Sequence, residues 1–424
     1  MIVNRFPLRK TWVDLLKRPE VNNTLLEEKI RPIIEEIRLN GDKALRKFTL
    51  EFDKVELKTL QIAQHEITAA LNAIKPELLD SIRLAATNIT AFHKAQVQKP
   101  EKIETMPGVV CWRRSVGIEK VGLYVPGGTA PLFSTLLMLA IPAIIAGCRE
   151  IIICTPPGKD GDVHPAVLAT AAFLGVKKIF KAGGVQAIAA MALGTETIPR
   201  VAKIFGPGNQ YVTMAKQLIQ QEGVSIDMPA GPSEVAVYAD QTANPSFVAA
   251  DLLSQAEHGA DSQVIFVTCH EPLIENVQQE LTAQLGQLPR SEFAAKALQN
   301  SKIILVNNKE EGMDLLNMYA PEHLILACED AESLSEKVIN AGSVFIGHYS
   351  PESAGDYASG TNHTLPTNGY AHAYSGVSVD SFVKKITYQQ LSRQGLQNIA
   401  FAVEVMAEAE GLRAHAEAVR IRLK

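Results

Sequence analysis

Gln255 and His258 are a pair of side chains whose types and spacing could bind a metal ion or a substrate. They lie near the end of the segment 244–259, where Asn244 followed by Pro245 is typical of a helix start. Side chains three residues apart lie one above the other on the same helix face, so both could grip one ion. A histidine at the carboxyl end of a helix also interacts favourably with the helix dipole, and this alternative stays open.

Glu322 and His323 are adjacent and follow Pro321. Histidine is the natural proton acceptor near neutral pH, and a neighbouring carboxylate can supply a second base or activate water. The proline favours a non-helical approach to the next strand. Because adjacent side chains usually diverge, a capping glutamate beside a packed histidine is the alternative interpretation.

Asp356 and His363 are the ligand-capable residues of the segment 350–369, which has almost no large apolar side chain. A loop of this length inside a compact domain is usually functional or disordered. The sequence therefore predicts a functional loop here, although asparagines such as Asn362 could simply form turns.

Glu410 and His415 lie close to the C-terminus, where solvated helix residues are the plain alternative. They become candidate site residues only in combination with the other ligand-type side chains. A mixed nitrogen and oxygen set suits a borderline divalent ion such as zinc, and spacing alone cannot join its members. The candidate set is Gln255, His258, Asp356 and His415.

Glycine-marked turns follow three expected strands, at 122–135, 182–186 and 205–209. A turn that opens a helix presents backbone N–H groups to phosphate, and open α/β sheets bind ligands at this edge. None of the turns has the GxGxxG pattern, so a nucleotide crevice and ordinary tight turns are both possible interpretations.

The elements that must position these residues alternate between short strands and longer helices. We expect strands at 121–125, 150–154, 178–180, 235–238, 264–268, 303–306 and 343–346. This pattern, in two alternations at about 120–240 and 245–350, is typical of parallel sheets in α/β proteins. Residues 10–95 are expected to be helical, 100–106 a polar connection, and 387–423 a terminal helical arm broken at Gly411.

Composition sets outer limits on the function. The 424 residues are enough for about two or three domains. A net charge of −5 does not indicate a basic surface that would bind nucleic acid or an anionic membrane. A hydrophobic content of 46% is ordinary for a soluble protein. Five cysteines without a CxxC pair fit a reducing compartment.

The N-terminus is too charged for a secretory signal, and prolines and glycines interrupt the uncharged stretch 121–148, so we expect a cytoplasmic protein.

Taken together, these segments resemble the histidinol dehydrogenase family over nearly the whole chain and in the family's order. IDMPAGPSE and SQAEHG are highly specific, whereas GPGN or a Gly-Gly turn alone is not. The other matching segments are GDKALRKFTLEFD, VGLYVPGGTAPLFSTLLMLAIPAIIAGC, KAGGVQAIAAMALGTETIP, KIFGPGNQYV, ADLLSQAEHGADSQ, APEHL, SAGDYASGTNH and EGLRAHAEAV.

The resemblance implies a role for each site residue. Zinc is expected on Gln255, His258, Asp356 and His415. Proton transfer is expected from Glu322 and His323, and NAD contacts from Tyr124, Gln186 and Asn209. The substrate contacts that it implies are Ser233, His363 and Glu410, together with His323 and the four zinc ligands.

The resemblance also implies an intertwined homodimer of two incomplete Rossmann-like, parallel-sheet domains with helical N-terminal and C-terminal extensions. The C-terminal arm would bring Glu410 and His415 to the partner's site. The expected units are a helical extension at 1–22, a first α/β domain at 23–120 plus 240–380 that carries most of the zinc and catalytic site, a second at 121–239 with the NAD contacts, and the arm at 381–424.

The implied reaction is the oxidation of L-histidinol through L-histidinaldehyde to L-histidine, with two NAD+ consumed and one zinc ion per subunit. The alternative from the same residues is a zinc hydrolase in which Glu322 activates metal-bound water. A cysteine thiohemiacetal is a competing route for the aldehyde step, with Cys111 or Cys148 as the nucleophile, but Cys148 reads better as a small buried hydrophobe. A non-catalytic nucleotide-responsive scaffold is the third possibility.

Overall fold

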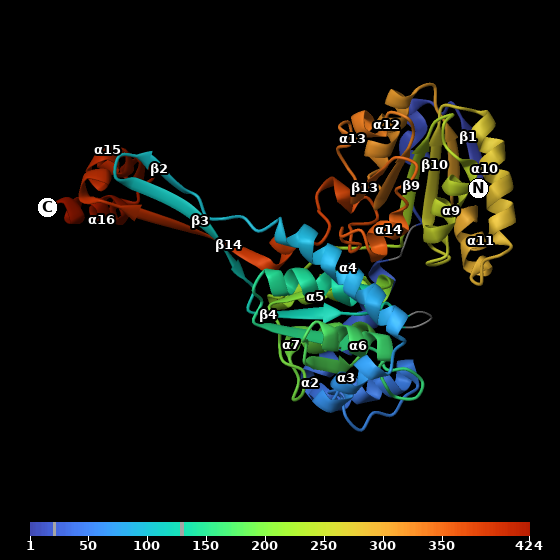
Figure 1. Ribbon diagram of the computed structural model, residues 1–424. Helices are drawn as coiled ribbons and strands as arrows, with labels where there is room; N and C mark the ends of the chain where they lie inside the picture. The colour runs from blue at the N-terminus through green and yellow to red at the C-terminus, as the bar shows by residue number, and fades with distance from the viewer. Residues whose placement is uncertain (20–22, 128–130) are drawn as a thin grey trace.

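The computed structural model describes residues 1–19, 23–127 and 131–424. Figure 1 shows two α/β bodies and a long arm that projects away from both. Each body is built on a parallel sheet, so the expected mixed α/β class with parallel sheets is confirmed.

The five-stranded body contains the sheet β6-β5-β4-β7-β8, in which every neighbouring pair is parallel. The strand order reverses between β4 and β7, which is where open α/β sheets form a crevice at their carboxyl edge. The strands are β4 (Lys120–Tyr124), β5 (Glu150–Thr155), β6 (Lys178–Lys181), β7 (Lys203–Phe205) and β8 (Ser225–Ile226).

Helices cover both faces of this sheet (Figure 1). One layer packs α2 against α7 and α8, and the other contains α3, α4, α5 and α6. The helices are α2 (Asn23–Phe48), α3 (Gln64–Ala69), α4 (Pro76–Lys94), α5 (Phe133–Ile145), α6 (Pro165–Phe173), α7 (Gly184–Leu193) and α8 (Gln210–Ile219).

The packing of α2 differs from the expected grouping of 23–120 with 240–380. Its apolar stripe, including Ile30 and Ile34, is buried with Met191 and Leu218 in the core of the five-stranded body. The periodicity of an amphipathic helix shows that one face must be buried, but it does not identify the sheet that buries it.

The six-stranded body contains the parallel sheet β1-β11-β10-β9-β12-β13. Its strands are β1 (Ile2–Arg5), β9 (Glu234–Ala239), β10 (Gln263–Thr268), β11 (Lys302–Leu305), β12 (His323–Ala327) and β13 (Ser343–Ile346). Its helices are α1 (Trp12–Leu15), α9 (Pro245–Ala256), α10 (Pro272–Leu285), α11 (Ser291–Gln299), α12 (Lys309–Tyr319), α13 (Ala331–Ser335) and α14 (Glu352–Tyr357).

Two expectations about this body need correction. Residues 1–22 were expected to be a helical extension, but β1 adds a short strand to the sheet edge beside β11, and four residues are too few for a clear strand pattern. The segment 350–369 was expected to be a loop, but α14 forms inside it and carries Asp356.

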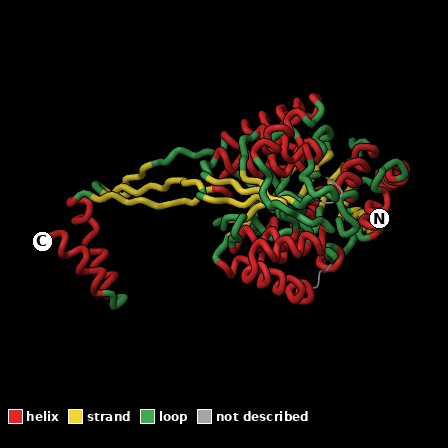
Figure 2. Tube along the Cα trace, turned by 90° about the horizontal axis from the view of Figure 1, so that it is seen from below, coloured by secondary structure: helices red, strands yellow, loops and turns green. Residues whose placement is uncertain are grey.

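The arm consists of the antiparallel sheet β14-β3-β2, followed by two helices that pack on each other. Figure 2 shows the paired strands leading to these helices. Its elements are β2 (Lys102–Met106), β3 (Val109–Gly117), β14 (Val383–Leu391), α15 (Arg393–Ala409) and α16 (Arg413–Leu423).

The arm corrects two further predictions. Residues 100–106 are mostly strand rather than a connection, and 387–391 are strand rather than helix. The predicted interruption of the helix at Gly411 is confirmed, because this residue has a φ of 74° and separates α15 from α16. In the ranges that the structure describes, no helix combines the length and apolarity that crossing a membrane requires.

Candidate active site

A cavity of about 660 Å³ lies between the two bodies, where carboxyl ends of strands in the five-stranded sheet face amino ends of strands in the six-stranded sheet. Pro126 and Pro207 follow β4 and β7, while Ser233 and Glu322 precede β9 and β12. The cavity gathers most of the predicted site residues: Asn209, Ser233, Gln255, His258, Glu322, His323, Asp356 and His363.

Glu322 and His323 are buried at the start of β12, and both are held by the backbone of Glu234 at the start of β9. The Glu234 N–H donates to Glu322 Oε2 at 2.9 Å, and His323 Nδ1 is 3.0 Å from the Glu234 carbonyl. A carbonyl only accepts, so Nδ1 carries a hydrogen and the neutral ring has its lone pair on Nε2. That nitrogen lies 3.3 Å from Asp356 Oδ1.

The electrostatics of the pair follow from its burial. Removal from water raises the pKa of Glu322 to about 8. Burial alone would lower the pKa of His323, but the carboxylates of Glu322 and Asp356 raise it to about 10. Burial opposes ionisation of Asp356, yet its contact with His323 keeps the pKa of this carboxyl below its ordinary value. The arrangement places one imidazole between two carboxyl groups and can move protons between them.

Gln255 lies in the last turn of α9, near the helix end as predicted, and Asn244 caps the helix start by accepting a 2.9 Å bond from the Ser246 N–H. His258 lies in the turn just beyond the helix rather than on its face, and its N–H bonds back to the Gln255 carbonyl. Both side chains nevertheless reach the same cavity.

The donor set at this point fits a cation. Gln255 is 1% exposed, and neither its amide oxygen nor its amide nitrogen meets the geometry of a hydrogen bond, although the Glu352 carboxyl lies near enough to interact with the amide. Buried polar groups normally have one, so an orphaned amide indicates a missing partner. Burial lowers the pKa of His258, which favours the neutral imidazole that binds metals, and Asp356 adds an ionised carboxylate.

His415 and Glu410 do not join this group within one chain. His415 belongs to α16 and Glu410 follows α15, both at the far end of the arm (Figure 1). Neither residue lines the cavity between the bodies.

His363 connects the two bodies across the cavity. Its Nδ1 is 2.9 Å from the Asp356 carbonyl, and its Nε2 is 3.2 Å from the hydroxyl of Thr135 on α5. Ser233 contacts His258 in a similar way, with its hydroxyl 3.2 Å from Nδ1. These contacts orient both imidazoles within the cavity wall.

The three residues expected to contact NAD lie at the carboxyl edge of the five-stranded sheet, and only Asn209 lines the cavity. The Tyr124 hydroxyl accepts a 3.0 Å bond from the Gly184 N–H, and the buried Gln186 Oε1 has no partner. The side chain of Asn209 caps α8. Part of the first glycine turn, residues 128–130, lies outside the described residues.

Two other features of the structure resemble ligand sites. Asp240, Cys328 and Asp330 form a metal-type cluster at the opposite end of β9 and β12, but Asp330 pairs with Lys309, and the Asp240 oxygens already accept from Thr242 and Glu329. This cluster contains none of the predicted ligands.

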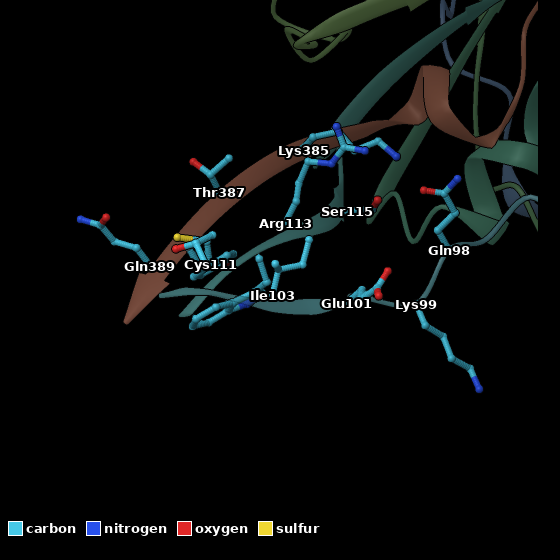
Figure 3. Close-up of a pocket in the computed structure, with 13 residues that line it drawn as sticks. Gln98, Lys99, Glu101, Ile103, Cys111, Arg113, Ser115, Lys385, Thr387 and Gln389 are labelled. Carbon is cyan, nitrogen blue, oxygen red and sulfur yellow. The ribbon is translucent and has the colours of Figure 1, made fainter. Parts of the chain in front are cut away.

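The second feature is a cavity on the arm sheet, where Figure 3 shows Cys111 beside Thr387 and Gln389. It contains no predicted site residue other than this candidate cysteine. Among the described residues that line the cavity between the bodies there is no cysteine at all.

Glu234, which holds Glu322 and His323, and its own partners Arg18 and Asn368 were not predicted as site residues. Glu234 lies inside the quoted segment IDMPAGPSE, so the motif held a signal for it without indicating a role. Arg18 carries no local signal, because its partner Glu234 is 216 positions away in the sequence.

Comparison with known proteins gives a consistent result. A family model described as histidinol dehydrogenase matches residues 16–423. The histidinol dehydrogenase of Bacteroides thetaiotaomicron is 59% identical over 419 residues, covering 99% of this chain and 98% of the relative. That of Xylella fastidiosa is 53% identical over 401 residues, with 94% and 93% covered. The crystal structure of histidinol dehydrogenase from Elizabethkingia anophelis aligns with a TM-score of 0.98 at 54% identity, covering 100% of this chain and 98% of that one.

Proposed function

Because the chain belongs to the histidinol dehydrogenase family, we propose that it oxidises L-histidinol through L-histidinaldehyde to L-histidine, with NAD+ as hydride acceptor and zinc as resident metal. The observation that carries the proposal is the buried pair Glu322–His323 beside the orphaned amide of Gln255. It joins proton-transfer groups and metal-type donors in one cavity.

Gln255, His258 and Asp356 would hold the metal, with His415 supplied by a partner subunit. Bound zinc would orient the substrate through its nitrogen atoms and would take no part in electron transfer. The orphaned amide and the neutral His258 support this assignment.

The first oxidation needs a base for the hydroxyl proton of histidinol. His323 is suited to this role in its neutral form, because the Glu234 carbonyl holds Nδ1 as a donor and leaves Nε2 for the proton. The neighbouring carboxylates that raise its pKa to about 10 make this neutral form a stronger base. Removing that proton as hydride departs avoids positive charge on the alcohol oxygen.

The second oxidation needs a water molecule added to the aldehyde. Glu322 is the base that we assign to this step, because its pKa of about 8 lets it accept a proton near the working pH. His323, once it has released the alcohol proton to solvent, takes a proton from the hydrate as the second hydride leaves. Ser233, His363 and the partner's Glu410 would contact the substrate.

NAD+ would take one hydride in each step and would be held near Tyr124, Gln186 and Asn209. The unpaired Gln186 oxygen at the carboxyl edge of the sheet supports a polar ligand there. The strand order of each sheet, which reverses at β4/β7 and at β9/β12, supports the interpretation of both as Rossmann-like units. The reducing cytoplasm fits the five free cysteines.

Measurement of NADH formation with histidinol tests the proposal. We expect two equivalents of NADH per histidinol, loss of the activity on chelation and its return with zinc. A zinc hydrolase using Glu322, or a scaffold without activity, would give no NADH, and that result would overturn the proposal.

A further inference from the structure

Arg18 makes an unusually complete set of contacts next to the catalytic pair. Its guanidinium forms a two-pronged ion pair with the carboxylate of Glu234, in which Nη2 lies 2.9 Å from Oε2, and the same Nη2 donates to the Tyr319 carbonyl at 2.7 Å. The guanidinium also stacks on the Tyr319 ring at 4.0 Å from its centroid. The Arg18 side chain is 16% exposed and that of Glu234 is 2% exposed.

Glu234 links Arg18 to both proposed catalytic residues. Its carboxylate is fixed by Arg18 and by the Asn368 N–H at 3.0 Å. Its backbone N–H and carbonyl are the groups that hold Glu322 and His323. A shift of Glu234 would therefore move the two catalytic side chains together.

Arg18 also holds the turn that leads from α12 into Glu322 and His323. The turn before Pro321 contains Ala320 in the left-handed region, with φ at 50° and ψ at 65°. A non-glycine residue adopts this conformation only where its surroundings hold it. Arg18 donates to the carbonyls of Tyr319 and Ala320, which belong to the two peptide units that flank the Cα atom of Ala320.

We propose that Arg18 and Glu234 are positioning residues that set the geometry of Glu322 and His323, an inference that rests on the proposed function. The Nε and Nη2 donors of Arg18 are used by Glu234 and by the carbonyls of Tyr319 and Ala320. A buried ion pair adds little net stability compared with apolar packing, but its fork geometry fixes direction, which is what two proton-transfer groups need.

Arg18→Ala, Arg18→Lys and Glu234→Gln test the proposal, with the wild type in the same NADH assay. We expect kcat to fall about 10- to 100-fold while KM for histidinol and for NAD+ stays nearly constant, because misplacing reacting groups by about 1 Å can cost 100-fold. Arg18→Lys retains a charge but not the fork, so it should be impaired with the fold intact. Arg9→Ala is the matched control, because it removes an exposed ion pair from the same N-terminal segment.

Millimolar guanidinium added to Arg18→Ala should restore part of kcat, since the side chain borders the open cavity, and it should not help Glu234→Gln. Three results would overturn the proposal: kcat unchanged in Arg18→Lys, a raised KM at constant kcat, or a loss of stability alone without recovery by guanidinium. Failure of the wild type to form NADH would instead refute the proposed function.

Discussion

At the scale of single residues, replacement of Glu322 should slow the oxidation of the aldehyde more than the oxidation of the alcohol. Glu322→Gln keeps the shape of the side chain but removes the base that activates water. We expect aldehyde oxidation to fall by about 10² to 10⁴, the usual worth of a general base, with a smaller effect on alcohol oxidation. Separate assays with histidinol and histidinaldehyde measure the two steps. Equal losses in both would contradict this division of roles.

The raised pKa of Glu322 gives this step a pH dependence. Only the ionised carboxylate accepts a proton, so ionisation of Glu322 should make the rate of aldehyde oxidation rise with pH through about 8, whereas a further rise towards pH 10 belongs to His323. Glu322→Gln should lack this rise. Because the folded state raises this pKa, the contribution of the neutral carboxyl to stability is complete below the unfolded pKa and is lost as pH rises through about 8.

Cys148→Ala should retain both activities, which tests the thiohemiacetal alternative. Burial raises the pKa of Cys148 to about 11, whereas a nucleophilic thiol needs a lowered pKa. Its sulfur contacts the Phe382 carbonyl at 3.7 Å and packs with the core. We expect unchanged kcat and about 1 kcal/mol less stability, measured by urea unfolding. Cys111→Ala, which removes the other candidate nucleophile, should likewise retain both activities, and lost aldehyde oxidation in either folded variant would revive the cysteine route.

Residue types and spacing predicted only part of the site. Their residue types predicted that Gln255 and His258 would share a site, and both reach one cavity, but His258 lies in the turn beyond α9 rather than on the helix face that the spacing predicted. The proline before Glu322 correctly predicted a strand. Asp356 could be joined to them only through the family resemblance. The contact between Arg18 and Glu234 spans 216 positions and follows from folding alone, so no local pattern could indicate it.

At the scale of elements, a buried ion pair secures the end of β7 beside α8. Lys216 Nζ donates to the Gly206 carbonyl at 2.9 Å and pairs with Asp227, whose Oδ2 accepts the Gly206 N–H at 2.8 Å. Lys216→Met should cost about 3–5 kcal/mol in urea unfolding, because it leaves a buried carboxylate unpaired.

The double variant Lys216→Met/Asp227→Asn should cost less than the single variant, since it leaves no unpaired charge. Lys337→Met is the control, because it removes an exposed pair with Glu310 and should change stability by less than about 1 kcal/mol. A single variant as stable as this control would refute the role assigned to the pair.

Elements with a strong local pattern were predicted well, and those that depend on a partner were not. The expected strands at 121–125 and 264–268 correspond to β4 and β10, whose continuous apolar runs are buried on both faces. In contrast, β14 reads VKKITYQQL, which suits either state, and only its antiparallel pairing with β3 fixes it as a strand. The same pairing turns an expected terminal helix into a two-part arm.

At the scale of the whole molecule, packing within one subunit does not account for the apolar surface of the arm. Large apolar side chains remain open on its helices, with Phe401 81%, Met406 65% and Ile421 67% exposed. Exposed apolar clusters of this kind mark interfaces. We therefore expect a second copy of the chain to cover the arm.

The shared site can be tested with mixed dimers of His258→Ala and His415→Ala. Each variant alone should be inactive, because every site lacks one ligand. In a purified heterodimer, one site combines an intact body from one chain with an intact arm from the other, so about half of the wild-type activity should return. If each chain completed its own site, the heterodimer would stay inactive. Differently tagged, co-expressed chains allow this measurement, and an inactive heterodimer or a monomeric wild type would rule out arm exchange.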